Sequence, residues 1–405
     1  MKPKTFMLIA GEASGDLLAA ELVSALLAAS KRSEDGRAPQ FFGAGGPKMA
    51  AAGVELAFDL TQHSVIGISD VLKDYFKFRW LFNQLLKLAV EREPDAIIGV
   101  DFGGFNLRFG HAIKQYVRKN RSASTPWNPK IIQFVSPQVW ASRPGRANLL
   151  AADYDLLLSI FPFEKDWYAR RVPKLRVEFV GHPMVERFQK SEVSPSSAVA
   201  LLRRVESQKS EALAASPTIL LLPGSRPAEL RRHLPVMLGA LKLIQEKLPS
   251  SRAKMVLPNK ALKTIANKLS MLPSNTEIQI GNLPEALAQA DVAIASTGTV
   301  TMECAFFGVP TVTLYKTSWS TYQIAKRIVT VKSLTMPNLL ANEEVFPEFV
   351  QGAATPENIS HAALELLQNE PRRAQIKKRL AEIVSQLGGS GASQRAAAAI
   401  LSLFT

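Results

Sequence analysis

The stretch that decides the fold spans residues 217–226 and reads Pro-Thr-Ile-Leu-Leu-Leu-Pro-Gly-Ser-Arg. Its unbroken apolar run, Ile219–Leu222, is typical of a buried parallel strand, and the Pro-Gly pair after it predicts a tight loop. Residues 227–248 then place leucines at helical spacing, which predicts a helix directly after the loop. A strand, a glycine loop and a helix in succession indicate an α/β domain whose loop offers backbone N–H groups to a phosphate.

A second unit of the same kind opens the chain. Thr5–Ala10 is apolar and predicts a strand, a Gly-Glu-Ala-Ser-Gly-Asp turn follows, and residues 17–28 predict a helix. The carboxylates of the turn would repel a pyrophosphate. We therefore interpret the turn either as a polar site for sugar hydroxyls, with Glu12 and Asp16, or as a plain turn with an N-cap at Ser14 or Asp16.

The length of 405 residues suits two or three domains. We expect a first α/β domain at residues 1–190 and a second at 216–355. The Ser-rich and Ala-rich region from 190 to 215 is expected to hold the junction. Residues 356–405 are expected to be helical, with a break at the glycines of 388–391, and they can cross back to the first domain.

The composition points to an anionic partner and a reducing compartment. The formal net charge is +14, which suits a nucleotide, a phosphate, nucleic acid or an acidic membrane surface. No recognised nucleic-acid motif is present, so we expect no nucleic-acid partner. With one cysteine, no intramolecular disulfide can form, and the five histidines lack metal-ligand spacing. No apolar run reaches the ~18 residues of a membrane span, and a signal-peptide pattern is missing, so we expect a cytoplasmic protein.

A lone carboxylate follows the strand expected at Asp95–Val100. Asp101 opens the sequence Asp-Phe-Gly-Gly-Phe-Asn, and ligands of open α/β sheets gather at the carboxyl ends of strands. Asp101 is therefore a candidate general base. The alternative is an N-cap for a helix beginning at Leu107. The nearby pair Asp153 and Asp155 precedes a strand instead of following one, so we interpret it as structural.

The second domain carries the features of a nucleotide-diphosphate site. Ser296, Gly298 and Thr299 follow the strand expected at 292–295, and they place hydroxyls and a glycine at a helix N-terminus, where anions bind. Glu303 lies one turn further along and can accept hydrogen bonds from a ribose. Arg226 can fork onto a diphosphate. No metal is required by this set.

These two sites together predict a single displacement. Asp101 would deprotonate an acceptor hydroxyl that attacks an anomeric carbon, and Arg226 with the helix N-terminus would stabilise the departing diphosphate. One base without an enzymic nucleophile predicts inversion at that carbon.

The stretch 71–82, Val-Leu-Lys-Asp-Tyr-Phe-Lys-Phe-Arg-Trp-Leu-Phe, mixes aromatic and basic residues. This combination is typical of an interfacial helix that dips into anionic lipid. The alternative is an ordinary amphipathic helix packed on the sheet, which we slightly favour because such helices are more common. Residues 336–340, Met-Pro-Asn-Leu-Leu, are interpreted as a loop.

Six motifs occur in order along the chain: Gly11–Asp16, Val135–Ala141, Phe161–Glu164, Gly181–Pro183, Leu222–Arg226 and Pro337–Ala341. With these motifs in this order, the chain resembles the lipid-A-disaccharide synthase family over nearly its whole length.

The resemblance implies an inverting glycosyltransferase of the GT-B type, with two Rossmann-like domains that face a cleft. It implies transfer of a diacylated glucosamine from its UDP donor to diacylglucosamine 1-phosphate, with no cofactor. It also implies work at the inner membrane surface and a possible homodimer that exchanges C-terminal parts. Asp101 matches the family's proposed base. The substrate-binding candidates are Glu12, Ser14, Asn106, Ser225, Arg226, Ser296, Gly298, Thr299, Glu303 and Asn338.

The chain also departs from the family, and other functions fit parts of it. Gly104 stands where the family usually has a second Asp. A UDP-sugar 2-epimerase would share the fold and donor site and would use Glu12, Asp16 and Asp101 for acid-base work. Another UDP-sugar-dependent GT-B transferase, or a basic nucleic-acid-binding module, are the remaining alternatives.

Overall fold

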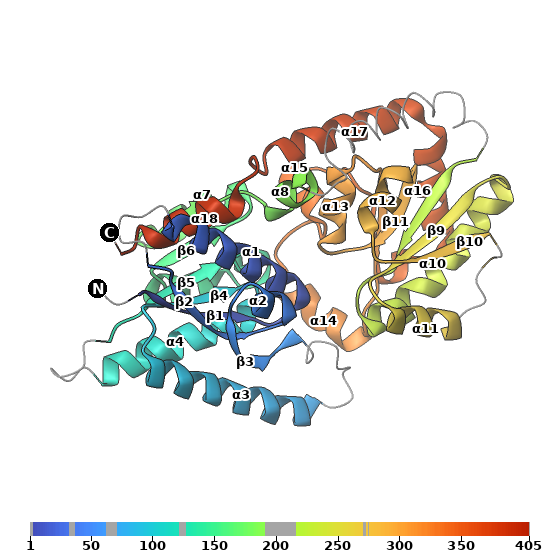
Figure 1. Cartoon of the computed structure of the whole chain (residues 1–405). Helices are drawn as coiled ribbons and strands as arrows, with labels where there is room; N and C mark the ends of the chain where they lie inside the picture. The colour runs from blue at the N-terminus through green and yellow to red at the C-terminus, as the bar shows by residue number, and fades with distance from the viewer. Residues whose placement is uncertain are drawn as a thin grey trace. The chain divides into compact units, whose positions relative to one another are not determined.

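The computed structural model describes residues 3–31, 37–61, 71–120, 127–190, 216–269, 273 and 275–404, with only the backbone for 71–77 and 189–190. The chain forms two compact units (Figure 1). Unit 1 comprises Met1–Pro183 and Leu387–Thr405, and unit 2 comprises Met184–Gln386. The expected junction after residue 190 lies outside the described residues.

Unit 1 is built on a parallel sheet, which has seven strands among the described residues. The strand order is β3-β2-β1-β4-β5-β6-β7, so the direction of winding reverses between β1 and β4. The strands are β1 Thr5–Ala10, β2 Gln40–Gly45, β3 Glu55–Asp59, β4 Ala96–Val100, β5 Lys130–Phe134, β6 Leu156–Ser159 and β7 Val177–Phe179.

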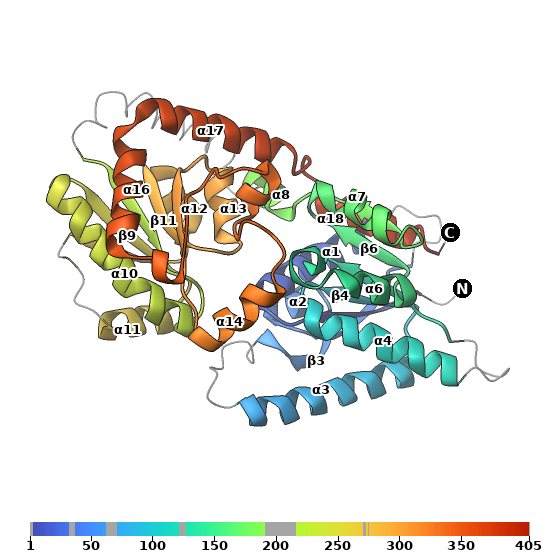
Figure 2. The same ribbon diagram turned by 180° about the vertical axis from the view of Figure 1, so that it is seen from behind.

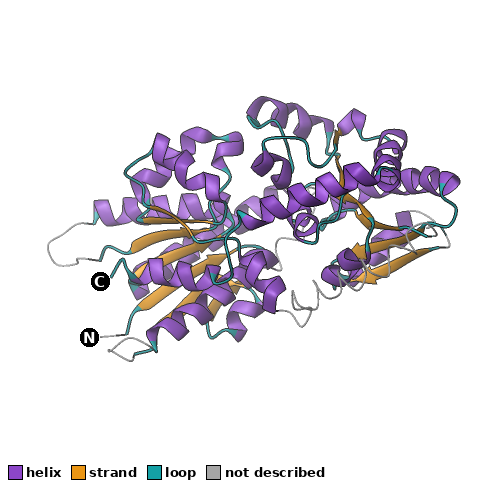
Figure 3. Cartoon of the chain, turned by 90° about the horizontal axis from the view of Figure 1, so that it is seen from above, coloured by secondary structure: helices purple, strands orange, loops and turns teal. Residues whose placement is uncertain are grey.

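Helices cover both faces of this sheet, as the two opposite views in Figures 1 and 2 and the view from above in Figure 3 show. One face packs against α1 and α18, and the other against α3, α4 and α6. The helices are α1 Ala13–Ser30, α2 Pro47–Ala51, α3 Val71–Arg92, α4 Gly103–Lys119, α5 Val139–Ser142, α6 Ala147–Asp153, α7 Pro162–Arg171 and α18 Ala392–Leu401, with a 3₁₀ turn at Pro144–Arg146.

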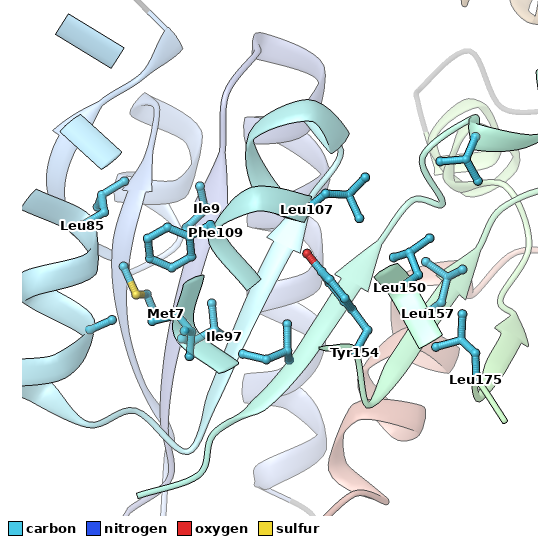
Figure 4. Packing of buried hydrophobic residues seen from close by; sticks show 14 of the residues in the cluster. Met7, Ile9, Leu85, Ile97, Leu107, Phe109, Leu150, Tyr154, Leu157 and Leu175 are labelled. Carbon is cyan, nitrogen blue, oxygen red and sulfur yellow. The ribbon is translucent and has the colours of Figure 1, made fainter. Parts of the chain in front are cut away.

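The α3/α4 face holds the larger apolar cluster of the unit. Figure 4 shows Phe109 of α4 among Leu85 of α3, Met7 of β1 and Ile97 of β4, all fully or almost fully buried. Burying such side chains stabilises a fold by about 1.5–3 kcal/mol each. The part of α3 from Leu81 onward is thus held as a packed amphipathic helix.

The C-terminal segment belongs to unit 1 because side-chain and main-chain contacts attach it there. Phe404 packs against Phe6 of β1 with ring centroids 5.9 Å apart. Nε of Arg395 donates a hydrogen bond of 2.8 Å to the main-chain oxygen of Val180, and the N–H of His182 donates one of 2.9 Å to the oxygen of Leu387. The first contact attaches the C-terminus to the central strand β1, and the other two attach the segment around α18 to the loop after β7.

Unit 2 repeats the plan with a parallel sheet of six strands among the described residues, in the order β10-β9-β8-β11-β12-β13. The strands are β8 Thr218–Leu222, β9 Arg252–Leu257, β10 Thr276–Ile280, β11 Val292–Ser296, β12 Thr311–Tyr315 and β13 Glu348–Val350. The helices are α8 Pro183–Lys190, α10 Pro227–Lys247, α11 Lys260–Leu269, α12 Leu283–Gln289, α13 Val300–Phe306, α14 Trp319–Ile328, α15 Met336–Ala341, α16 Pro356–Gln368 and α17 Glu370–Ser385, with a 3₁₀ turn at Gln351–Ala353.

The prediction of two Rossmann-like α/β units is confirmed, and most predicted strands match to within two residues. Two local predictions are wrong. The first helix begins at Ala13 and not at Leu17, and residues 336–341 form the helix α15 and not a loop. The short strands β3 and β13 and the helix α14 were not predicted.

One helix in the described ranges, α1, has the length and apolar composition that could cross a membrane. Half of it is buried, and it packs on β1, β2, β4 and α18 of unit 1, as a core helix does.

Candidate active site

In each unit, most predicted site residues follow the two central strands where the winding reverses, and Asn338 of α15 is an exception. Glu12 and Ser14 follow β1 in unit 1, and Asp101 follows its neighbour β4. Arg226 follows β8 in unit 2, and Thr299 follows its neighbour β11. The carboxyl ends of strands at such a reversal are where open α/β sheets bind ligands. The fold therefore brings Glu12, Ser14 and Asp101 to one edge of the unit 1 sheet. It brings Arg226 and Thr299 to one edge of the unit 2 sheet.

The turn after β1 differs from the prediction in its local structure. Glu12 is the N-cap of α1 but makes no capping bond through its side chain, and Ser14 lies inside the first helical turn. Asp16 is almost fully buried, and its carboxylate accepts hydrogen bonds of 2.9, 3.0 and 2.9 Å from the N–H groups of Gly46, Lys48 and Met49. Asp16 thus caps the neighbouring helix α2, so the predicted cap of its own helix, at Ser14 or Asp16, is wrong.

Asp101 lies directly beside this turn. The Ser14 hydroxyl donates a hydrogen bond of 3.5 Å to its Oδ2. Burial raises the pKa of Asp101 above its usual range, and the negative charge of Glu12 raises it further, while hydrogen bonds from the Phe102 N–H and the Ser14 hydroxyl oppose the rise. The N-cap alternative is wrong, because α4 begins at Gly103 with Phe102 as its cap and no side-chain capping bond. A carboxylate with a raised pKa is a better proton acceptor near neutral pH.

The backbone around Asp101 is strained. Asp101 and Phe102 have φ angles of 51° and 45°, and Val135, after the adjacent strand β5, has a φ of 67°. Left-handed conformations of residues other than glycine cost on the order of 1–3 kcal/mol each and cluster at functional sites. For a β-branched residue such as Val135 the conformation is a genuine outlier. The loops after β4 and β5 are therefore held in shape by their surroundings.

Asn106 is one of those surroundings. Its side chain is 3% exposed, and its Nδ2 donates a hydrogen bond of 2.8 Å to the main-chain oxygen of Asp101. Its Oδ1 is buried with no hydrogen-bond partner among the described residues, and so is Oε1 of Gln133 on β5. A buried polar atom left in that state costs about 1–3 kcal/mol. No pattern in the sequence pointed to Gln133, because a single polar residue within an apolar strand does not reveal which loop it will contact.

In unit 2, the loop after β8 presents Ser225 and Arg226. The N–H of Ser225 donates a hydrogen bond of 3.1 Å to Oε2 of Glu229, and Nη1 of Arg226 lies 3.5 Å from Oε1 of the same residue. The Arg226 side chain is 59% exposed. Gly224 has a φ of 120°, a conformation that only glycine adopts readily. The guanidinium is thus oriented by Glu229 and accessible to a ligand.

A buried histidine that the sequence did not single out holds this loop. Nδ1 of His233 lies 2.9 Å from the main-chain oxygen of Pro223, and the N–H of Lys316 donates a hydrogen bond of 3.0 Å to its Nε2. Because Nε2 accepts, Nδ1 carries the proton and donates to Pro223. Burial lowers the pKa of His233, which keeps the ring neutral. His233 therefore ties the loop after β8 to the end of β12.

The loop after β11 contains the other predicted nucleotide contacts. Ser296 is buried, Gly298 has a φ of 139°, and Thr299 is the N-cap of α13 but makes no capping bond through its side chain. Thr299 thus stands at the N-terminus of a helix, as predicted, and the hydroxyl of Thr301 donates a hydrogen bond of 2.7 Å to the oxygen of Gly298. The open backbone at Gly298, where an added Cβ would meet nothing within 4 Å, leaves room for a ligand.

Glu303 lies in the first turn of α13 and is half-buried. Burial raises the pKa of Glu303 to about 7, although the positive charge of Arg187 opposes the rise. A carboxyl in this state can exchange hydrogen bonds with hydroxyl groups either as an acceptor or, when protonated, as a donor.

Asn338 has a different environment from the other predicted contacts. It is 2% exposed, and its Nδ2 donates to the oxygen of Phe346 and to Oε1 of Glu348, at 2.8 Å each. Its Oδ1 accepts from the N–H groups of Val345 and Phe346, at 2.9 and 2.8 Å. All four hydrogen-bonding positions of the amide are used within the protein. Asn338 therefore joins α15 to β13, and a ligand would have to replace one of these partners.

The pair Asp153 and Asp155, predicted to be structural, is held by hydrogen bonds and ion pairs. Asp153 accepts from Nδ1 of His111 at 2.6 Å and from Arg118 at 3.0 Å, and Asp155 pairs with Lys114 at 3.1 Å. Across the described ranges, no three His, Cys, Asp or Glu side chains come together as a metal-ligand set.

Comparisons with known proteins cover the whole chain. Residues 6–403 match the family described as Lipid-A-disaccharide synthetase. The lipid-A-disaccharide synthase of Trichlorobacter lovleyi is 36% identical over 99% of this chain and 98% of the relative. That of Myxococcus xanthus is 35% identical over the same shares.

Solved structures share the fold at low identity. A putative UDP-N-acetylglucosamine 2-epimerase from Listeria monocytogenes has a TM-score of 0.62 at 15% identity, with 100% of this chain and 97% of that chain covered. The glycotransferase of kitacinnamycin has a TM-score of 0.58 at 17% identity, with 98% of each chain covered. These likenesses show the two-unit α/β fold of the GT-B type. The epimerase alternative is not favoured, because the two relatives named above, at 36% and 35% identity, are lipid-A-disaccharide synthases matched over 98% of their length. The chain belongs to the lipid-A-disaccharide synthetase family.

Proposed function

We propose that the chain joins UDP-2,3-diacylglucosamine to 2,3-diacylglucosamine 1-phosphate and forms the β-1,6-linked lipid A disaccharide 1-phosphate precursor and UDP. The observation that carries the proposal is the family match over residues 6–403, together with a carboxyl of raised pKa at the strand reversal of unit 1. As a member of this family, the chain is a glycosyltransferase of lipid A biosynthesis.

In the proposed reaction, Asp101 is the general base. The acceptor hydroxyl oxygen attacks the anomeric carbon of the donor, and its proton passes to the Asp101 carboxylate. The bond from that carbon to the diphosphate oxygen breaks, and UDP leaves from the opposite face, which inverts the centre. Ser14 donates a hydrogen bond to the Asp101 carboxylate and the charge of Glu12 acts on it, and both residues are proposed to contact the acceptor sugar. Asn106 holds the Asp101 backbone, so we propose that it acts through Asp101.

Unit 2 is proposed to hold the donor nucleotide. Arg226, oriented by Glu229, suits the diphosphate because a guanidinium makes two parallel hydrogen bonds to phosphate oxygens. The loop after β11, with Ser296, Gly298 and Thr299, is proposed to approach the nucleotide, and Glu303 to accept from the ribose hydroxyls. Ser225 is proposed to contribute from the loop after β8.

We also propose that the protein is cytoplasmic and lies on the inner face of the membrane. Half of the eight large apolar side chains exposed in the described residues lie between positions 319 and 334. Trp319 and Ile324 of α14 are 76% and 60% exposed, and no side chain of α14 is buried. Residues 317–334 contain no Asp or Glu but carry exposed Lys326, Arg327 and Lys332. Exposed aromatic and basic residues together favour an anionic lipid surface.

The side chains of residues 71–77, which form the first part of the predicted interfacial stretch, lie outside the described residues. Trp80, further along α3, is 53% exposed and meets Phe58 edge to face.

A homodimer stays a prediction, which mass photometry at several concentrations tests.

The experiment for the proposed function is a transfer assay with UDP-2,3-diacylglucosamine and 2,3-diacylglucosamine 1-phosphate in detergent, without added metal. The expected products are the disaccharide 1-phosphate and UDP in equal amounts. Conversion of a UDP-sugar without acceptor would instead indicate an epimerase. No product under conditions where UDP binds would refute the proposed acceptor.

A further inference from the structure

The main-chain oxygen of Asp101 accepts two buried side-chain amides. Nδ2 of Asn106, from α4, and Nε2 of Gln133, from β5, each donate to it at 2.8 Å. A carbonyl oxygen has two lone pairs, so these bonds fill its capacity. Nε2 of Gln133 also donates to the oxygen of Val135 at 3.2 Å. One side chain therefore connects the two strained loops after β4 and β5.

The orientation of the Gln133 amide follows from its partners. An amide oxygen turned toward the oxygens of Asp101 and Val135 would be repelled, so the nitrogen must face them. Oε1 is thereby left pointing toward Gly99, which is the residue directly paired with Gln133 between β4 and β5. An added Cβ at Gly99 would lie 2.7 Å from this Oε1 and 2.8 Å from Cγ of Asn106. Glycine in β4 makes room for both amides.

This arrangement is a poor one for stability alone. Gln133 is fully buried in a strand whose neighbouring positions are apolar, and its Oε1 has no partner among the described residues. An apolar residue of the same size would pack there without an unpaired acceptor. Local departures from the rules of stability tend to occur at functional sites.

We propose that Gln133 is a positioning residue, which holds the backbone of Asp101 so that its carboxylate faces the reacting hydroxyl. This inference rests on the proposed role of Asp101 as the base. Gln133 does not touch substrate. It acts through its hydrogen bond to the main-chain oxygen of Asp101. Asn106 is the second donor to that oxygen, and Gly99, which has no side chain, leaves space for both amides.

The first test is Gln133→Met, which keeps the length of the side chain and removes the donor. Small misplacements of a catalytic group can cost up to about 100-fold, so kcat in the transfer assay is expected to fall about 10- to 100-fold. The Kd for UDP, measured by calorimetry, is expected to stay unchanged. The melting temperature is expected to stay within about 4 °C of the wild type, because removal of the unpaired Oε1 offsets the loss of the donor to the oxygens of Asp101 and Val135.

A matched control is Trp127→Phe. The Trp127 indole donates a hydrogen bond of 3.0 Å to the oxygen of Pro94, at the opposite end of the same strand β4. This variant is expected to lower the melting temperature and leave kcat unchanged. The two variants therefore separate a loss of position from a loss of stability.

The second test is Gln133→Glu. When protonated, the new carboxyl can donate to the Asp101 oxygen, and when ionised it cannot. Its kcat relative to the wild type is expected to fall as the pH rises, an effect that a purely structural role would not produce.

Either of two results overturns the inference: a Gln133→Met protein with wild-type kcat, or one that fails to fold. Asp101→Asn in the same assay separates this failure from that of the proposed function. If Asp101→Asn is inactive while Gln133→Met is fully active, only the positioning role is lost. If Asp101→Asn keeps its activity, the base role and this inference are overturned together.

Discussion

The indole Nε1 of Trp140 donates a hydrogen bond of 2.9 Å to Oε1 of Glu164, and both side chains are buried. The Ser159 hydroxyl donates to Oε2 of the same carboxyl at 2.6 Å. Through these bonds, Glu164 joins the loop after β5 to the start of α7 after β6. Two of the motifs that marked the sequence, 135–141 and 161–164, are thus two sides of one buried network in unit 1.

This network predicts a pH dependence of stability. Burial raises the pKa of Glu164 from 4.5 to about 7, against hydrogen bonds that lower it. Between these values the unfolded chain is ionised at this position while the folded chain keeps its proton, so raising the pH favours unfolding. Glu164 is expected to reduce the free energy of unfolding by about 3 kcal/mol between pH 4.5 and 7. Urea denaturation at several pH values measures this, and Glu164→Gln, which cannot titrate, is expected to flatten the decline. An equally steep decline in Glu164→Gln would contradict the assignment.

Removing the proposed base should abolish turnover and spare donor binding. Asp101→Asn keeps the size of the side chain but cannot accept the proton, and kcat is expected to fall about 10²- to 10⁴-fold. The Kd for UDP should be unchanged by calorimetry. Because the pKa of Asp101 is raised, the acidic limb of the wild-type pH profile is expected at a higher pH than for an ordinary carboxyl. A limb in the usual Asp range would argue that a different group titrates.

The diphosphate contact can be tested with two arginines of the same segment. Arg226→Ala is expected to weaken UDP binding by about 1.5–3 kcal/mol, the usual contribution of a hydrogen bond to a charged group, or roughly 10- to 150-fold. Arg231→Ala removes the same charge from an exposed position of α10 and should change the affinity little. Calorimetry with UDP compares the two variants. Equal effects would show that general charge, and not the loop after β8, governs binding.

The lipid-facing role of α14 predicts sensitivity to its cations. Each Lys or Arg near an anionic surface contributes about 1 kcal/mol, so the double change of Lys326 and Arg327 to Ala should weaken vesicle binding roughly 30-fold. The matched control changes Lys377 and Lys378, exposed on α17, to Ala and should bind like the wild type. Flotation with phosphatidylglycerol vesicles measures both. No binding of the wild type at low salt would refute the membrane proposal.

The glycine in β4 provides a test of packing. Gly99→Ala would bring a Cβ within 2.7 Å of Oε1 of Gln133, and such overpacking costs about 1–3 kcal/mol. Both the melting temperature and kcat are expected to fall, because the added methyl group displaces the amides that hold Asp101. Gly104→Ala, where an added Cβ meets nothing within 4 Å, is the matched control. A Gly99→Ala protein as stable as the wild type would contradict the close packing at this position.

The sequence by itself determined the features that depend on local order along the chain. Apolar runs such as Ile219–Leu222, short and bounded by Pro and Gly, favour buried parallel strands, and their alternation with helical periods indicated two Rossmann-like units. The position of Asp101 after a strand placed it at the ligand-binding edge of a sheet, whichever helices cover that sheet.

Only the tertiary structure decided which polar groups act on one another. Asp16 was a candidate cap of its own helix, but it caps α2. Asn338 was a candidate substrate contact, but all its hydrogen bonds lie within the protein. Gln133 was not singled out by any pattern in the sequence. The partners of Asp16 lie 30 to 33 residues away and those of Asn338 lie 7 to 10 residues away, while Asp101 lies 32 residues from Gln133. Hydrogen bonds act over about 3 Å in space, so a pattern of neighbours along the chain cannot reveal them until the sheets bring distant strands side by side.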